Sequence, residues 1–219
     1  MGVVTKYISK VGKDYKISEH FKLREFACKD GTDKVLYSTE LFEMLEKLRA
    51  YGGYTITINS GYRTQAYNKK IGGGSKSQHI LGKAADIVVK KDGKIVSAKL
   101  ICCLCQTLGF KGVAYISENA VHLDMRDSGT YRGDERRGYS GNVGGDFYSY
   151  FKVAKSTITA MKVKEEPKKE VAVENKASEW AKQSWAKASA KGIVDGSNPQ
   201  EPATREQVIV ILDRLGLIK

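Results

Sequence analysis

A run of sixteen residues near the carboxyl-terminal end, MKVKEEPKKEVAVENK at positions 161–176, divides this chain of 219 residues. The run is rich in lysine and glutamate, lacks aromatic residues and contains a proline, so it has too little apolar surface to form a core. We therefore expect a folded domain over residues 1–158, a charged linker over 159–176 and a second unit over 177–219. The second unit is too short to bury much apolar surface alone.

The first unit alternates helix-like and strand-like segments. Apolar residues recur at helical spacing in residues 39–51, and residues 97–108 also predict a helix. Alternating and β-branched residues predict strands within residues 54–63, 84–89 and 112–125. This order predicts an α+β domain with an antiparallel sheet and packed helices. In the second unit, residues 177–192 and a segment after 204 predict a small two-helix module.

The net charge of +12 favours polyanionic partners, which include nucleic acid, anionic lipid and the anionic polysaccharides of a bacterial wall. The chain has no basic helix with interleaved aromatic residues, so nucleic acid is the weaker expectation. No stretch approaches the roughly 20 apolar residues of a membrane span, and the first residues lack the apolar segment of a signal peptide. We expect no membrane partner and synthesis in the cytoplasm.

The cysteines predict core packing and not a metal site. Three of the four lie close together in the helix expected over residues 97–108, at Cys102, Cys103 and Cys105. Paired Cys-x-x-Cys elements are absent, so we expect buried, reduced thiols.

Histidine and aspartate provide a more specific pattern. His79 lies seven residues before Asp86, and Gly82 between them supplies a bend that brings His79 back beside the strand of Asp86. Of the other two histidines, His20 lies in a segment that reads as structural, while His122 lies in a strand-like segment. A His/Asp/His set would leave one position of a tetrahedral zinc ion open for water. By chemistry alone, a purely structural role for His122 stays open.

Other polar residues surround this pattern. Asp124 shares a strand face with His122, where it would accept a proton from water or orient a ligand. Arg63, in the turn SGYRT, is a cation for a carbonyl oxygen or a terminal carboxylate. Ser77 and Gln78 either line a peptide site or only shape a loop. Arg126 begins a basic, glycine-rich segment that either contacts anionic peptide or is solvated.

Three elements, SGYRT, SQHILGKAAD and HLD, resemble in this order the zinc D-Ala-D-Ala carboxypeptidases and related phage endolysins. The family pattern Ser-x-His-x-x-Gly-x-Ala-x-Asp is matched at Ser77, His79, Gly82, Ala84 and Asp86. The segment HFKLREFACKDG also resembles an opening segment of one branch of that family, and the resemblance covers about residues 18–151. It implies Zn²⁺ held by His79, Asp86 and His122, with Arg63 stabilising an oxyanion or gripping substrate.

One position departs from the family. Many relatives place an acidic general base three positions before the last histidine, and Asn119 stands there in this chain. The resemblance leaves Asp124 and Glu118 as alternatives, and strand geometry favours Asp124. With that acid, the family implies hydrolysis of an amide bond in peptidoglycan stem peptides.

The tail resembles a single S-layer-homology module. Its tryptophans are Trp180 and Trp185, and the element TRE is formed by Thr204, Arg205 and Glu206. In that family the TRE-like element contributes to binding wall polysaccharide, usually with three modules acting together. With one module here, the alternative is that the tryptophans only form a core.

These resemblances predict a phage or prophage endolysin that acts on the wall after release through a holin-formed lesion. One alternative is a host D-Ala-D-Ala carboxypeptidase in wall maintenance. Another is a zinc-bearing wall-binding protein that does not hydrolyse its ligand. A nucleic-acid binder would leave the His/Asp/His pattern unexplained.

Overall fold

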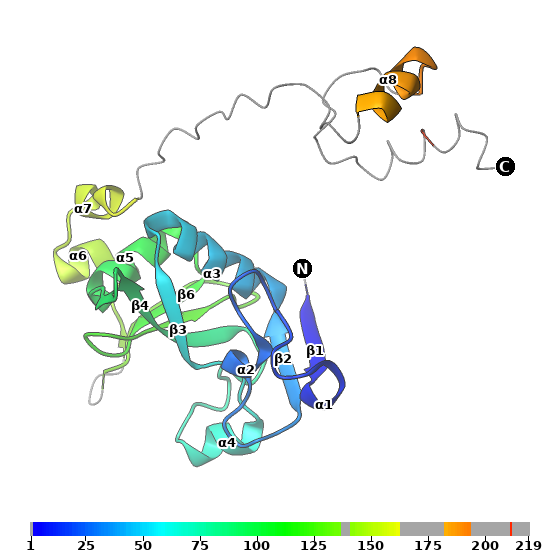
Figure 1. Cartoon of the computed structure of the whole chain (residues 1–219). Helices are drawn as coiled ribbons and strands as arrows, with labels where there is room; N and C mark the ends of the chain where they lie inside the picture. The colour runs from blue at the N-terminus through cyan, green and yellow to red at the C-terminus, as the bar shows by residue number, and fades with distance from the viewer. Residues whose placement is uncertain (1, 137–140, 163–181, 194–210, 212–219) are drawn as a thin grey trace. The chain divides into compact units, whose positions relative to one another are not determined.

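The computed structural model describes residues 2–136, 141–162, 182–193 and 211. The chain separates into two compact units, Met1–Val163 and Lys164–Lys219. All but one of the described helices and strands belong to the first unit (Figure 1). Among the described residues, no helix has the length and apolar character needed to cross a membrane.

The first unit mixes short strands and helices. Its strands are β1 Val3–Tyr7, β2 Lys34–Ser38, β3 Thr55–Ser60, β4 Ala84–Lys91, β5 Lys94–Ile95, β6 Gly112–Tyr115, β7 Val121–Asp124, β8 Tyr131–Asp134 and β9 Gly141–Asn142. Its helices are α1 Ile8–Val11, α2 Leu23–Phe26, α3 Thr39–Gly52, α4 Gln65–Lys70, α5 Ala98–Leu108, α6 Phe147–Phe151 and α7 Lys155–Ala160. The predicted α+β class is confirmed.

The main sheet has the strand order β3-β4-β7-β6-β8-β9, with β5 paired to β4, while β1 and β2 form a separate antiparallel pair. Neighbouring strands of the main sheet are antiparallel except β6 and β8, which are parallel. The sheet is thus antiparallel as expected, with this one parallel pair added. Both edges of β7 are occupied by β4 and β6, so β8 adds to the free edge of β6.

The core lies between one face of this sheet and the helices. Helix α5 packs against β4, β6 and β7, and α3 packs against α5. Ile87, Val113 and Leu123 are fully buried on that face. Because side chains alternate along a strand, Asp86, His122 and Asp124 project from the opposite face. The sheet thus separates the apolar core from the polar site.

The longest of the described helices forms where the apolar spacing predicts it. The Ser38 side chain accepts a hydrogen bond from the Leu41 N–H at the start of α3, and Gly53 ends the helix in a left-handed conformation with φ of 65°. The three predicted cysteines on α5 are buried and unpaired, as is Cys28. Helix α7 runs to Ala160, so the expected linker start at residue 159 falls within a helix.

In the second unit, α8 Lys182–Ala190 is the described part of the helix expected over residues 177–192. It ends as the glycine predicts, because the N–H groups of Gly192 and Ile193 donate to the carbonyls of Ser189 and Ala188. The predicted wall-binding residues Trp180, Thr204, Arg205 and Glu206 lie outside the described residues, as does most of the linker.

Candidate metal centre

Two neighbouring strands bring the central residues together. Asp86 on β4 and His122 on β7 are directly paired in the sheet, and both project from its polar face. His79 reaches them from the loop before β4. The His79 Nε2 atom lies 3.2 Å from Asp86 Oδ1 and 3.2 Å from His122 Nδ1, and His122 Nδ1 lies 2.9 Å from Asp86 Oδ1. Three ligand-type atoms therefore converge on one point.

A bend at Gly82 places His79 in this position. Gly82 has φ of 68°, and a Cβ atom there would lie 2.4 Å from the carbonyl oxygen of Leu36 on β2. The Gly82 carbonyl accepts a hydrogen bond from the Ser38 N–H at 2.9 Å, which fixes the loop against that strand. A residue with a side chain would collide with β2 and strain the backbone. The predicted bend is present.

Each histidine is oriented through its outer nitrogen. His79 Nδ1 lies 2.7 Å from the Gly61 carbonyl oxygen, which can only accept, so this nitrogen donates. His122 Nε2 lies 3.3 Å from Asp124 Oδ2 and donates to that carboxylate. Both inner nitrogens are then left with lone pairs directed at Asp86. Hydrogen bonds of this kind set the tautomer of metal-binding histidines.

The turn SGYRT holds the other side of the centre. Arg63 donates through Nη2 to Asp86 Oδ2 at 2.5 Å and through Nε to Ser60 Oγ at 2.9 Å. This leaves Asp86 Oδ1 facing the histidines. Arg63 is only 13% exposed, so the structure places the predicted cation beside the centre in a fixed orientation.

Asp124 lies behind His122, on the side away from Asp86. It is fully buried, and both of its oxygens are held by Arg126, at 2.9 Å from Nε to Oδ1 and 2.5 Å from Nη2 to Oδ2. The predicted proximity of Asp124 and His122 is observed, and its geometry suits orientation of the imidazole. Arg126, predicted to bind substrate, is engaged by Asp124 and lies over the Tyr131 ring at 4.9 Å.

The electrostatics of the centre favour a positive charge. Burial disfavours the charged form of His122, but its hydrogen bonds to Asp124 and Asp86 outweigh burial and raise the pKa of His122 to about 10. Burial also opposes ionisation of Asp86, yet the hydrogen bonds with His122 and His79 hold the pKa of Asp86 well below its usual range. Two carboxylates therefore stabilise a proton on His122, or a cation in its place.

Two acidic residues outside the ligand set occupy different faces. Glu118 lies on the side of α5, where its carboxylate is 3.8 Å from Lys99 and its carbonyl accepts from the Ala98 N–H. Glu135 follows β8, and its N–H donates to the Tyr115 carbonyl at 2.8 Å, which continues the strand register. Ala114 on β6 pairs with both His122 on β7 and Gly133 on β8, so these residues share one face of the sheet. Because side chains alternate along a strand, Glu135, two residues after Gly133, lies on the same face as the metal centre.

Glu135 was missed from sequence because its position depends on this register. Its side chain is exposed, and its negative charge contributes to the raised pKa of His122. Burial raises the pKa of Tyr131 to about 12, and the nearby Glu135 carboxylate adds to that shift. The only sequence signal was the position of Glu135 in the segment after the last histidine.

The remaining predicted residues lie around this centre or away from it. Ser77 Oγ accepts weakly from the His79 N–H at 3.4 Å. The Gln78 Oε1 atom is buried, and no hydrogen-bond partner for it is found in the described part of the chain. His20 binds Glu46 on α3, with Nδ1 2.8 Å from Oε2, which agrees with its expected structural role.

The donor set fits zinc. Two imidazole nitrogens and one carboxylate oxygen, all within 4.8 Å of one another, are the ligands that zinc takes in catalytic sites, and three protein ligands leave a coordination position open. Three lone pairs that face each other repel unless a cation or proton lies between them. The α+β domain and this open His/Asp/His set define the class of catalytic zinc proteins.

Comparison with known families agrees with this class. Residues 17–124 match the family model described as Peptidase M15. The matched span contains Arg63, His79, Asp86 and His122 and ends at Asp124. The match indicates a zinc metallopeptidase that acts on substrates of the peptidoglycan type. No curated protein matches the chain.

Proposed function

We propose that this protein is a zinc endopeptidase of the endolysin type, which hydrolyses an amide bond in peptidoglycan stem peptides. The observation that carries the proposal is the convergence of His79 Nε2, His122 Nδ1 and Asp86 Oδ1. Each of these side chains is held by a further hydrogen bond through its other polar atom. Bound zinc would supply a Lewis acid that polarises the scissile carbonyl and activates water for attack.

The protein's own residues divide the remaining work. Asp124 and the Gly61 carbonyl hold the two imidazoles in the tautomers that leave their inner nitrogens free. Arg63 fixes Asp86 and adds positive charge beside the carbonyl oxygen as negative charge develops there. Gln78, whose buried oxygen has no hydrogen-bond partner among the described residues, is suited to accept an N–H group of the bound peptide.

Proton transfer is assigned to Glu135. A general base has to be accessible to water and free to accept a proton. Asp124 is fully buried and bound at both oxygens, while Glu118 lies on the opposite face of the sheet. Glu135 is exposed on the face of the centre and interacts with His122 electrostatically. We therefore assign it the proton of the attacking water, and the return of that proton to the leaving amine.

Release from a lysing cell and attachment to the wall complete the proposal. The net charge of +12 favours contact with anionic wall polymers, and the TRE element of the tail supports wall binding through its resemblance to S-layer-homology modules. Maintenance of the wall by a host carboxypeptidase is the second candidate, since the same centre could remove a terminal D-alanine.

Digestion of purified Gram-positive peptidoglycan tests this assignment. Mass analysis of the products should find new amino termini within the stem peptide or its bridge and a loss of wall turbidity. Release of free D-alanine alone would instead establish the carboxypeptidase. If the zinc-bound protein leaves the walls of several bacteria intact, the result would support the alternative of a wall-binding protein that does not hydrolyse its ligand.

A further inference from the structure

A cavity of about 190 Å³ lies at the carboxyl end of β3. Its wall includes Ser60, Gly61 and Arg63, the same turn that orients His79 and Asp86. A group bound in this cavity therefore contacts the support of the metal centre directly. The cavity is large enough for a short side chain or a chain terminus, but not for a sugar polymer.

Positive charge dominates the lining. Arg24, Lys29 and Arg63 contribute cations, against the single carboxylate of Glu25. The Glu25 carboxylate is already used, because Oε2 accepts the N–H of Lys22 at 2.7 Å at the start of α2. Three cationic groups thus line the cavity against one carboxylate, and the partners of each cation decide which one is free to bind an anion.

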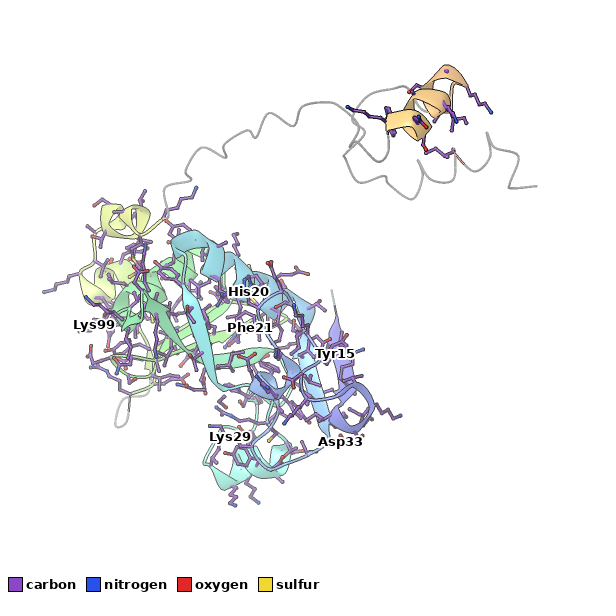
Figure 2. All side chains as sticks on the ribbon, viewed as in Figure 1. Tyr15, His20, Phe21, Lys29, Asp33 and Lys99 are labelled. Carbon is purple, nitrogen blue, oxygen red and sulfur yellow. The ribbon has the colours of Figure 1, made fainter. Side chains whose placement is uncertain are left out.

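The three cations differ in their partners. Arg24 donates to Asp14 at 2.6 Å, and Arg63 donates to Asp86. Lys29 is exposed, and in the described part of the chain it makes no ion pair. Lys29 follows α2 and lies well apart from Lys99 in Figure 2. Its ammonium group is free to meet an anion from outside the chain.

Apolar groups form another part of the wall. Ala27, Ile58 and Tyr67 line the cavity beside the cations. This combination suits a carboxylate on a short apolar stem, which would place its oxygens toward Lys29 and Arg63 and its carbon atoms against the apolar side chains. A phosphate on a flexible sugar chain would leave this apolar surface uncovered.

We propose that this cavity binds a free carboxylate of the substrate peptide, with Lys29 as its main cation. This inference rests on the proposed function, because it requires a peptide at the metal centre. A peptide held there passes Arg63 toward His79 and Asp86, so the cavity selects which amide bond reaches the centre. Stem peptides offer two carboxylates of this kind, the α-carboxylate of D-glutamate and the terminal carboxylate of D-alanine.

The test uses three peptides and the zinc-loaded full chain. The peptides are L-Ala–γ-D-Glu–L-Lys–D-Ala, in which the α-carboxylate of D-glutamate is free, the same peptide amidated at that α-carboxylate and the same peptide amidated at its terminus. Titration calorimetry should show that one of the two amidations weakens binding about 5- to 10-fold, because a charge-assisted hydrogen bond is lost. The amidation that matters identifies the bound carboxylate.

Two variants locate the effect. Lys29→Met should bind all three peptides with the lower affinity, whereas Lys99→Met, a change at a half-buried lysine away from the cavity, should keep the wild-type preference. The proposal is overturned if the wild-type chain binds the three peptides equally or not at all, or if Lys29→Met retains the preference.

The outcome is separable from that of the proposed function. If the protein shows a carboxylate preference that depends on Lys29 but leaves wall material intact, the proposed peptidase activity is contradicted and the proposed binding site is supported. If the protein cleaves wall material but shows no carboxylate preference, the proposed binding site is contradicted and the proposed peptidase activity is supported.

Discussion

Asp124 holds the outer nitrogen of His122, and Gly112 on β6 leaves the space that its carboxylate occupies. A Cβ atom on Gly112 would lie 1.9 Å from Asp124 Oδ2. Gly112→Ala should therefore push Asp124 away from His122 and lower zinc affinity by about 10- to 100-fold, as loss of an orienting hydrogen bond does. Competition with a chelating dye measures this affinity. Gly141→Ala, where a Cβ meets nothing within 4 Å, is the control. Equal zinc affinity in both variants would show that Asp124 does not orient the ligand.

The proton-transfer group gives a second prediction at this scale. Glu135→Gln should keep zinc and lower kcat on wall peptide by about 10²- to 10⁴-fold, the range for loss of a general base. Glu118→Gln is the matched control and should retain activity, because Glu118 lies on the α5 side of the sheet. A normal rate for Glu135→Gln together with a large loss for Glu118→Gln would reverse the assignment.

Some residues of the centre could be predicted from the sequence, and others could not. Spacing and resemblance predicted His79, Asp86 and His122, and strand alternation predicted that Asp124 lies beside His122. Whether Asp124 faces the metal or the outer nitrogen depends on the side-chain rotamer of His122, which a sequence pattern does not carry. Glu135 depends on the pairing of β8 with β6, which no local pattern specifies.

At the scale of elements, neighbouring residues in the turn between β3 and α4 have different structural roles. The Gly61 carbonyl holds His79, Arg63 holds Asp86, and Thr64 begins α4 by accepting the Tyr67 N–H at 3.1 Å. The Thr64 hydroxyl also donates to Asp30. This turn joins the support of the metal centre to the following helix.

Removal of that cap should weaken the element. Thr64→Ala loses both hydrogen bonds of the hydroxyl and should lower the free energy of unfolding by about 1 kcal/mol, measured by urea denaturation. Thr64→Ser retains the hydroxyl and should cost less. If the two variants are equally stable, the cap contributes nothing.

The sequence patterns predicted some helices and strands and missed others. Helices α3 and α5 and strands β3, β4, β6 and β7 form at the segments that their patterns indicated, with α3 one residue and β4 two residues longer than expected. Strands β1, β2, β8 and β9 were missed, because the strands they pair with define these short segments more than their own sequence patterns do. The parallel pairing of β8 was also missed, since it follows from which strand edge was still free.

At the scale of the whole molecule, catalysis and wall attachment should be separable. Every residue of the centre lies in the first unit, whereas the predicted wall-binding residues belong to the second. Deletion after Lys176 should therefore weaken sedimentation with cell walls and spare cleavage of small soluble peptides. Unchanged sedimentation of the shortened chain would remove the wall-binding role from the tail.

Zinc and wall cleavage, measured in the same sample of the full chain, test the central claim most directly. Removal of metal by a chelator should abolish the cleavage of peptidoglycan, and one equivalent of zinc should restore it. His79→Ala, Asp86→Ala and His122→Ala should neither retain zinc nor cleave. Cleavage that persists in the metal-free chain, or stoichiometric zinc in all three variants, would contradict the account.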